Sequence, residues 1–392
     1  MKILNVIDLM NPVFGGAEER VFQMSRHLGL ASVDVDILTT NYRLDQNWLS
    51  QLTSGNHYYV DAVYYRYLIP FGAKKWLNQN ISKYDVINIS KNWSFLSIMA
   101  ASAAVKHNVP YVFSAMGFAS IHNRSRFLKL LFKYFFTIPL VCRASACIAV
   151  TMEEKLDLIN LGALPENVHL IPNGVIPSNF LHKDDENFRR HYSLGDRKII
   201  LFIGRMDPIK GVHLLIDAFY GRRIKLTDWC LVLVGTQTSY RKKMERKALE
   251  LGLQDSIIFL DPIFGKLKSE AYHAAEFIVV PSVKDAMTII APEAACCSKP
   301  VLITNTSDFG ELAQYGGAVE VDPTIEGIEN GLDFLTNIDV DLVRMGKNGF
   351  DYVVNNFGWD RISKKYIDLF AAFVKTPAKS QEISVYISPA DK

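Results

Sequence analysis

The sequence has no excess of charge of one sign and no long apolar run. Its 392 residues carry 43 Lys and Arg against 41 Asp and Glu, a formal net charge of +2. This balance gives no strong positive field, which argues against a protein that binds nucleic acid. No apolar run reaches the length of about 18 residues that a membrane-spanning helix needs. No signal peptide precedes the first apolar run, which starts almost at Met1. We therefore expect a cytoplasmic protein.

Paired cysteines and clusters of metal ligands are also missing. None of the five cysteines has Cys-x-x-Cys spacing, and four lie in apolar or small-residue runs. We interpret them as reduced packing residues. No group of carboxylates or histidines has metal-ligand spacing, so no metal site is expected. The hydrophobic share of 49% is ample for folded cores and excludes a mainly disordered chain.

Short apolar runs rich in β-branched residues alternate with stretches of helical spacing along the chain. Lys2–Asp8 and Val33–Leu38 flank a first helix and predict a βαβ unit. Further strands are expected at 58–67, 85–90, 110–114, 146–150, 198–204, 230–235, 256–260, 277–281 and 300–303. A polar, charged stretch at 177–197 marks a junction between two halves. The length suits at least two domains, so the sequence predicts an α/β protein with two doubly wound parts.

A strand-to-helix loop carries the sequence Gly-Arg-Met-Asp-Pro-Ile-Lys-Gly at residues 204–211. It places Arg205 and Lys210 at the carboxyl end of a strand, where ligands of open α/β sheets bind. Two fixed cations beside a helix N-terminus suit a diphosphate, because charge, free N–H groups and the helix dipole all favour an anion. The alternative is that both are ordinary solvated surface charges.

A second motif follows the expected strand at 277–281. In this motif Asp285 and Glu293 are eight residues apart. We expect a loop through about Met287 and then a helix, whose first amides (Thr288, Ile289 and Ile290) face the same cleft and bind an anion. Glu293 can accept hydrogen bonds from ribose or sugar hydroxyls, and Asp285 can orient the sugar. The alternative for Glu293 is a helix-surface carboxylate, which its small apolar neighbours disfavour.

Two further stretches have two readings each. The Gly15-Gly16 turn after the first strand lets a ligand or a facing domain approach the backbone closely, or is a simple tight turn.

The stretch Arg124–Arg143 has a basic stripe and a wide apolar face, with Pro139 limiting the helix. Such a helix can lie on an anionic membrane surface, or can pack on its own sheet with a solvated basic stripe.

Together these residues resemble a retaining glycosyltransferase of the GT-B fold, glycosyltransferase family 4, also called group 1. The resemblance covers about residues 2–375. Four stretches carry it: Gly15-Gly16-Ala17-Glu18; Ile171-Pro172-Asn173-Gly174-Val175; Phe202-Ile203-Gly204-Arg205 with Lys210-Gly211; and Pro281-Ser282 through Glu293-Ala294 with Lys299-Pro300-Val301.

The resemblance implies two Rossmann-like domains that face each other across a cleft. They are expected at 1–176, on the acceptor side, and at 177–357, which binds the nucleotide sugar. A crossover helix at 358–376, near Trp359–Val374, returns to the first domain, and 377–392 is a frayed tail. Catalytic roles are implied for Arg205, Lys210, Asp285 and Glu293. Substrate-binding roles are implied for Gly15, Gly16, Asn173, Met287, Thr288, Ile289 and Ile290.

The chain departs from the family's pattern at three places. Asp285 stands where the family usually has Glu, so its reach is one methylene shorter. Met287-Thr288 replaces the common Phe-Gly. Ser114-Ala115-Met116-Gly117 lacks the His or Arg often found there, and the nearby His122 is better explained as a surface residue. These departures leave open the donor sugar and the contact from the first domain.

The expected activity is metal-independent, retaining transfer of a hexose from a nucleoside diphosphate sugar, with no other cofactor. By analogy with the family, the acceptor is a glycan or lipid-linked glycan of surface polysaccharide synthesis (lipopolysaccharide, capsule or exopolysaccharide). This places the protein in the cytoplasm, at the inner face of the membrane if Arg124–Arg143 makes a peripheral contact. Two alternatives stay open: a nucleotide-sugar epimerase of the same fold, and a nucleotide-sugar or glycan-binding subunit without catalysis.

Overall fold

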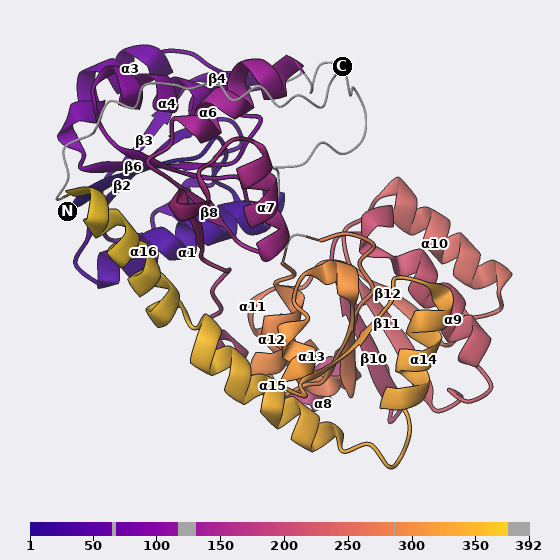
Figure 1. Ribbon diagram of the computed structural model, residues 1–392. Coiled ribbons are helices and arrows are strands. Elements are labelled where there is room, and N and C mark those ends of the chain that lie inside the picture. The colour runs from indigo at the N-terminus through magenta and orange to yellow at the C-terminus, as the bar shows by residue number, and fades with distance from the viewer. Residues whose placement is uncertain (65–67, 117–130, 286, 375–392) are drawn as a thin grey trace, which may run out of the picture.

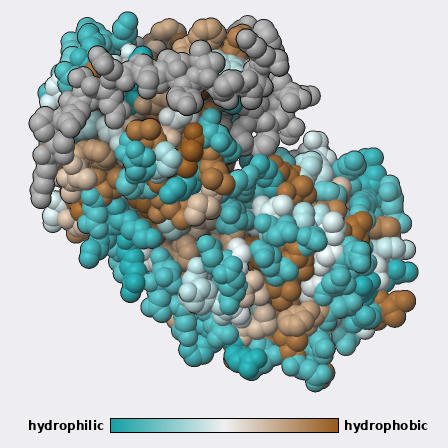
Figure 2. Space-filling view, in the orientation of Figure 1, coloured by the Kyte–Doolittle hydropathy of each residue, from teal (hydrophilic) through white to brown (hydrophobic). Residues whose placement is uncertain are grey.

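The chain folds into two lobes, each built on a parallel sheet with helices packed against its faces (Figure 1). The computed structural model describes residues 1–64, 68–116, 131–285 and 287–374. The visible face of the C-terminal lobe is mostly hydrophilic, with small apolar patches between the polar side chains (Figure 2). The two-part α/β architecture expected from the sequence is confirmed.

The N-terminal sheet has the strand order β3-β2-β1-β6-β7-β8-β9, and neighbouring strands pair in parallel. Its strands are β1 (Lys2–Val6), β2 (Asp34–Thr40), β3 (His57–Val60), β6 (Val86–Ser90), β7 (Tyr111–Ser114), β8 (Ala146–Ala149) and β9 (Val168–Leu170). The helices of this lobe include α1 (Gly16–Leu30), α2 (Gln46–Leu49), α3 (Ala73–Asn80), α4 (Phe95–Lys106), α6 (Ile138–Cys142) and α7 (Met152–Asn160). Most residues of the central strands are buried, because helices cover both faces of the sheet.

The C-terminal sheet has the order β12-β11-β10-β13-β14-β15, again with parallel pairing. Its strands are β10 (Lys198–Ile203), β11 (Trp229–Val234), β12 (Ile257–Leu260), β13 (Phe277–Val280), β14 (Val301–Thr304) and β15 (Ala318–Val321). Its helices include α8 (Asp185–His191), α9 (Val212–Arg222), α10 (Ser239–Glu250), α11 (Gly265–Ala274), α12 (Ile290–Cys296), α13 (Glu311–Gln314), α14 (Ile325–Leu335) and α15 (Leu342–Phe357).

The last described helix, α16 (Trp359–Val374), leaves the C-terminal lobe and runs along the N-terminal one, next to α1 (Figure 1). Its apolar side chains share one buried cluster with β1, β2 and α1. The bounds agree with the helix expected near Trp359–Val374. The N-terminal core is thus completed by residues from the far end of the chain.

Three local expectations were wrong. The run 58–67 is not one strand: β3 ends at Val60, and β4 (Ala62–Tyr64) pairs antiparallel with β5 (Leu68–Pro70) instead. The edge strand β15 was not expected. Pro139 does not end its helix, because a π-helical turn, η3 (Lys133–Thr137), precedes it and α6 continues through it. A wider turn accommodates a residue that has no N–H and a bulky ring.

All five cysteines are free, and four of them are buried packing residues; Cys142 is exposed. Burial raises the pKa of the Cys296 thiol to about 12, which keeps it protonated and unreactive. None of the described helices is both long enough and apolar enough to span a bilayer.

Candidate active site

The order of the strands marks one point in the C-terminal sheet where a ligand is expected. The chain builds outward from β10 to β12 and then returns to the other side of β10 with β13. Ligands of open α/β sheets bind at the carboxyl ends of the strands where the strand order reverses, which here are the ends of β10 and β13. Arg205 and Lys210 lie on the first loop and Asp285 lies on the second, as the sequence predicted.

At this point the two loops are joined by an ion pair between Lys210 Nζ and Asp285 Oδ2. The hydroxyl of Ser282 also donates to that carboxylate oxygen, at 3.3 Å. The two side chains are 24% and 16% exposed, so the pair can be reached from outside. The structure thus brings together one cation of the first motif and the first carboxylate of the second.

Arg205 lies apart from the other predicted residues. Its side chain is 64% exposed, and its Nε is 3.9 Å from the Asp207 carboxylate. It lines a shallow hollow with Thr238, which precedes α10, and with Tyr240 and Lys243 of α10. The guanidinium is therefore a solvated cation in this structure, close in sequence to Lys210 but facing a different hollow from Glu293.

Glu293 is held by two side chains of α11. Lys268 Nζ lies 2.7 Å from one carboxylate oxygen and 2.8 Å from the other, and the hydroxyl of Tyr272 donates to the carboxylate at 2.6 Å. Burial and the neighbouring charge of Glu293 raise the pKa of Tyr272, so the phenol stays protonated and keeps donating. The carboxylate is only 15% exposed. It is a positioned acceptor and not the freely solvated helix-surface carboxylate of the alternative reading.

The helix that carries Glu293 begins at Ile290, later than the sequence indicated. The amide of Thr288 donates to Ser307 O at 3.4 Å, and the amide of Ile290 donates to Thr288 Oγ1 at 3.2 Å. Two of the three amides expected to bind an anion therefore have partners within the chain. The Ile289 side chain is 37% exposed and lines the pocket described below.

Met287 forms a contact between the two lobes. It is buried, with a left-handed φ of 57°, and its sulfur accepts a hydrogen bond from the Asn173 amide at 3.2 Å. A bulky residue rarely adopts this backbone conformation. Two of the seven residues that the sequence predicted to bind substrate, Asn173 and Met287, therefore contact each other.

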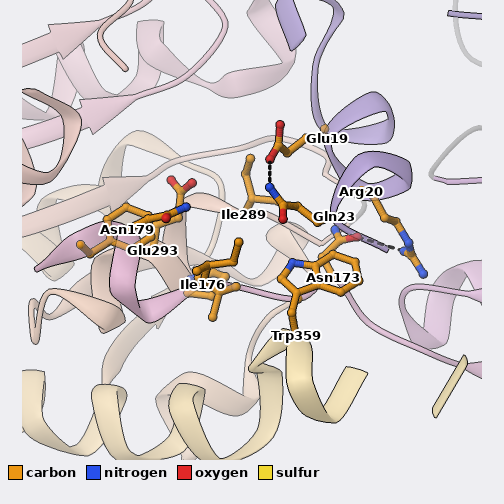
Figure 3. A pocket seen from close by; sticks show the side chains of 14 residues that line it. Glu19, Arg20, Gln23, Asn173, Ile176, Asn179, Ile289, Glu293 and Trp359 are labelled. Atoms are coloured by element: carbon orange, nitrogen blue, oxygen red, sulfur yellow. Dashed lines mark hydrogen bonds between the residues drawn. The ribbon is translucent and has the colours of Figure 1, made fainter. Parts of the chain in front are cut away.

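A pocket between the lobes collects several of the predicted residues (Figure 3). It is lined by Gly16, Glu19, Arg20, Gln23, Asn173, Gly174, Val175, Ile176, Asn179, Phe180, Ile289, Pro292, Glu293 and Trp359. A Cβ built on Gly15 or Gly16 would meet no atom of the described residues within 4 Å, so none of these residues packs against the glycine turn. Lys210, Asp285 and Arg205 do not line this pocket.

Sequence reasoning missed three residues that shape this region. Arg20 of α1 is buried and donates to Tyr366 Oη at 2.6 Å, to Asn173 Oδ1 at 2.9 Å and to the Ile171 carbonyl at 2.8 Å. Lys268 and Tyr272 fix Glu293. Lys268 and Tyr272 are four residues apart, which places them on one face of α11. Only the packing of α11 against α12 shows what that face contacts.

Only part of the amphipathic stretch Arg124–Arg143 can be placed, since 124–130 lie outside the described residues. In the remainder, Tyr134 and Phe135 are 57% and 68% exposed, beside Lys133. His122 also lies outside the described residues. Among the described residues, no group of three His, Cys, Asp or Glu side chains is arranged to hold a metal ion.

Comparison with known proteins agrees with this architecture. Residues 14–179 match the model for Glycosyltransferase Family 4, and residues 183–352 match that for Glycosyl transferases group 1. A D-inositol 3-phosphate glycosyltransferase of Stackebrandtia nassauensis is 30% identical over 331 residues, covering 79% of this chain and 72% of its own. A lipopolysaccharide 1,2-N-acetylglucosaminetransferase of Salmonella typhimurium is 24% identical over 216 residues, covering 51% of this chain and 55% of its own.

Among solved structures, Anabaena HepE in complex with UDP and glucose superposes with a TM-score of 0.79 at 18% identity. The match covers 95% of this chain and all of HepE. At that identity the likeness shows the fold, which is the two-lobed GT-B fold. With both family models matched and a relative at 30% identity over most of its length, the chain belongs to the group 1 glycosyltransferases, family 4.

Proposed function

We propose that the protein transfers a hexose from a nucleoside diphosphate sugar to a hydroxyl of a glycan or lipid-linked glycan, with retention of anomeric configuration. The observation that supports this most is the Lys210–Asp285 pair, which joins the two loops at the point where the C-terminal sheet reverses. This pair supports the proposal because ligands of open α/β sheets bind at such a reversal point.

The difficult step is departure of the diphosphate. The bond from the anomeric carbon to the phosphate oxygen breaks, and the electron pair stays on that oxygen. The acceptor oxygen bonds to the same face of the sugar, and its proton goes to the departing phosphate. Lys210 and the exposed Arg205 supply fixed positive charge where negative charge develops, which lowers the barrier. In this proposal the two cations do the work that a divalent ion does elsewhere.

Glu293 has a separate role in this proposal. Its carboxylate is oriented by Lys268 and Tyr272 and reaches the interlobe pocket. An oriented carboxylate accepts hydrogen bonds from vicinal hydroxyls, so we assign it to the ribose of the donor. Asp285 is assigned to the donor sugar, from which it can accept hydrogen bonds once a phosphate competes for Lys210.

A nucleotide screen and two substitutions test the donor side. UDP, GDP, ADP and dTDP are compared by thermal unfolding, because a bound nucleotide raises stability by mass action. With the sugar ester of the stabilising nucleotide, Lys210→Ala and Arg205→Ala should each lower the rate of nucleoside diphosphate release by about 100- to 1,000-fold. Lys347→Ala is the control, since this lysine is 71% exposed and pairs with Asp351 on α15. Stabilisation by no nucleotide, or normal turnover in both variants, would contradict the proposal.

The same assay separates the alternatives. An epimerase converts the nucleotide sugar without any acceptor, so mass and NMR analysis of the product formed from donor alone identifies it. A binding subunit without catalysis is stabilised by the nucleotide sugar but releases no nucleoside diphosphate with any acceptor. Turnover that survives a chelator supports the metal-independent mechanism, and loss of turnover that magnesium restores contradicts it.

We also propose that the acceptor belongs to surface polysaccharide synthesis and is met at the inner face of the membrane. The relative that acts on lipopolysaccharide and the exposed Tyr134 and Phe135 beside Lys133 support this proposal. Aromatic and basic side chains together favour an anionic bilayer surface. Co-sedimentation with phosphatidylglycerol vesicles should fall in a Lys133→Glu/Phe135→Ser double variant and stay unchanged in Lys347→Glu. Equal sedimentation of both variants would remove the membrane part of the proposal.

A further inference from the structure

The chain crosses between the lobes twice, and one buried side chain contacts both crossings. The first crossing is the segment 171–176 after β9, and the second leads into α16. The two pair with each other, because the amide of Val175 donates to the Phe357 carbonyl at 2.8 Å and the amide of Trp359 donates to the Val175 carbonyl at 3.2 Å. Arg20 of α1 forms hydrogen bonds with both crossings.

The guanidinium of Arg20 has three partners. It donates from Nε and Nη2 to the Tyr366 hydroxyl at 2.9 and 2.6 Å, from Nη2 to the Ile171 carbonyl at 2.8 Å, and from Nη1 to Asn173 Oδ1 at 2.9 Å. Arg20 is 4% exposed, so the cation is buried, and these three partners are neutral. Burying a charge beside neutral groups is costly, and a well-packed apolar side chain often serves stability as well as a buried ion does. Stability is therefore a weak explanation for an arginine at this position.

The bond to Asn173 leads on to the C-terminal lobe. Asn173 Oδ1 accepts from Arg20 (Figure 3), and the Asn173 backbone amide donates to Met287 Sδ at 3.2 Å. Met287 is buried and has a left-handed φ of 57°. A bulky residue keeps such a backbone conformation only where its surroundings fix it. Asn173 supplies part of that support, and Arg20 in turn fixes Asn173.

Met287 lies in the loop that carries out the donor side of the proposed reaction. It is two residues after Asp285, which pairs with Lys210 at the reversal point of the C-terminal sheet. A displaced Met287 therefore displaces the loop close to the carboxylate assigned to the donor sugar. Glu293, which is assigned to the ribose, is held from α11 instead. The path from Arg20 thus leads to the sugar end of the donor and not to its nucleoside.

We infer that Arg20 is a positioning residue for the transfer reaction, which acts through Asn173 and Met287. This inference rests on the proposed function. By fixing these two residues, Arg20 keeps the loop with Asp285 in place at the donor sugar. Loss of Arg20 slows transfer and leaves nucleotide binding intact, because other side chains make the ribose and diphosphate contacts. A residue that only stabilised the fold would affect the thermal midpoint and not the kcat of the folded enzyme.

Steady-state kinetics of Arg20→Gln and Arg20→Lys test this inference. Glutamine is too short to reach all three partners, and lysine keeps the charge but lacks the planar fork of donors. With the nucleotide sugar identified by the thermal screen, each variant should lower kcat by about 10- to 100-fold, the scale of a misplaced reacting group. The KM for the donor and the thermal shift produced by the nucleoside diphosphate should stay as in the wild type.

Arg189 provides a matched control in the C-terminal lobe. This arginine of α8 donates to the backbone carbonyls of Gly195, Arg197 and Ala274 at 3.2, 2.8 and 3.0 Å. Its side chain is 21% exposed, and none of these three partners lines the interlobe pocket. Arg189→Gln therefore removes a comparable set of hydrogen bonds away from the site. It should lower the thermal midpoint and leave kcat and KM unchanged.

Met287→Leu tests the other end of the path. Leucine has a similar volume but no sulfur to accept the hydrogen bond from the Asn173 amide. This variant should lower kcat by a factor similar to that of Arg20→Gln. Adding Arg20→Gln to it should lower kcat no further, because both substitutions break the same path. Losses that multiply in the double variant would show that the two residues act independently, which contradicts the inference.

A second readout needs no turnover. Methyl-labelled methionine gives NMR signals from the ten methionines, and Met287→Leu identifies the signal of Met287. That signal should shift in Arg20→Gln and stay in place in Arg189→Gln. An unshifted Met287 signal, or a wild-type kcat in the folded Arg20 variants, would overturn the inference.

The remaining outcomes separate this inference from the proposed function. If neither Arg20 variant folds, the kinetics of Met287→Leu decide, and a wild-type kcat in that variant counts against Arg20 as a positioning residue. If the wild-type protein turns over no nucleotide sugar, the proposed function fails. The Met287 signal then still shows whether Arg20 fixes the loop, because it is recorded without substrate.

Discussion

At the scale of single residues, the reversal point of the C-terminal sheet depends on a glycine. Gly211 follows Lys210 with a φ of 68°, and a Cβ built on it would lie 1.8 Å from the Pro281 carbonyl oxygen. The amide of Val283 donates to the Ile209 carbonyl at 2.8 Å beside it. The two loops therefore touch backbone to backbone, and this close approach lets Lys210 reach Asp285.

Two glycine substitutions separate the free-energy cost of crowding this close contact from the cost of the left-handed backbone conformation. Gly252 has the same φ of 68°, but nothing lies within 4 Å of its Cβ position. Gly252→Ala should cost about 1 kcal/mol, the usual penalty of a left-handed residue with a side chain. Gly211→Ala should cost about 3 kcal/mol or more, because the clash with Pro281 adds strain. Urea unfolding of both variants gives the difference, and equal costs would show that the loops can separate freely.

At the scale of elements, the sequence predicted those whose signal is local. β10 and β13 are continuous apolar runs, and α16 has strong amphipathic spacing, so their positions could be read directly. β15 was missed because it is a four-residue edge strand with half of its residues only partly buried. The start of α12 was placed too early because contacts to Ser307 hold the preceding residues in a loop. Such contacts join residues that are distant in sequence.

The candidate site likewise contains residues that the sequence predicted and residues that it did not. Lys210 and Asp285 were predicted because each follows a recognisable strand, and the carboxyl ends of neighbouring parallel strands meet. The partners of Glu293 were not predicted, since Lys268 and Tyr272 reach it only through the packing of α11 on α12. Residue type and spacing along one helix do not encode which neighbouring helix it packs against.

At the scale of the whole molecule, the contacts between the lobes that the described residues make include two polar contacts and the long helix α16. Lys284 and Glu153 form an exposed ion pair at 3.0 Å between the lobes, worth little in water. The Asn173 amide contacts the Met287 sulfur. By contrast, α16 buries Trp359, Ile362, Tyr366, Leu369 and Phe370 against β1 and α1. The N-terminal core therefore depends on residues of α16.

Removing α16 should consequently unfold one lobe and spare the other. Its five buried apolar side chains stabilise by about 1.5–3 kcal/mol each, and their sum is as large as the roughly 5–15 kcal/mol that stabilises a typical protein. A chain ending at Phe357 should lose the thermal transition reported by Trp48, Trp76 and Trp93 of the N-terminal lobe. It should keep the transition reported by Trp229 of the C-terminal lobe. These are followed by fluorescence of single-tryptophan variants, and a chain ending at Val374, which keeps every described contact, is the control. If the shorter chain unfolds at the control's midpoint in both lobes, α16 is an attachment and not part of the N-terminal core.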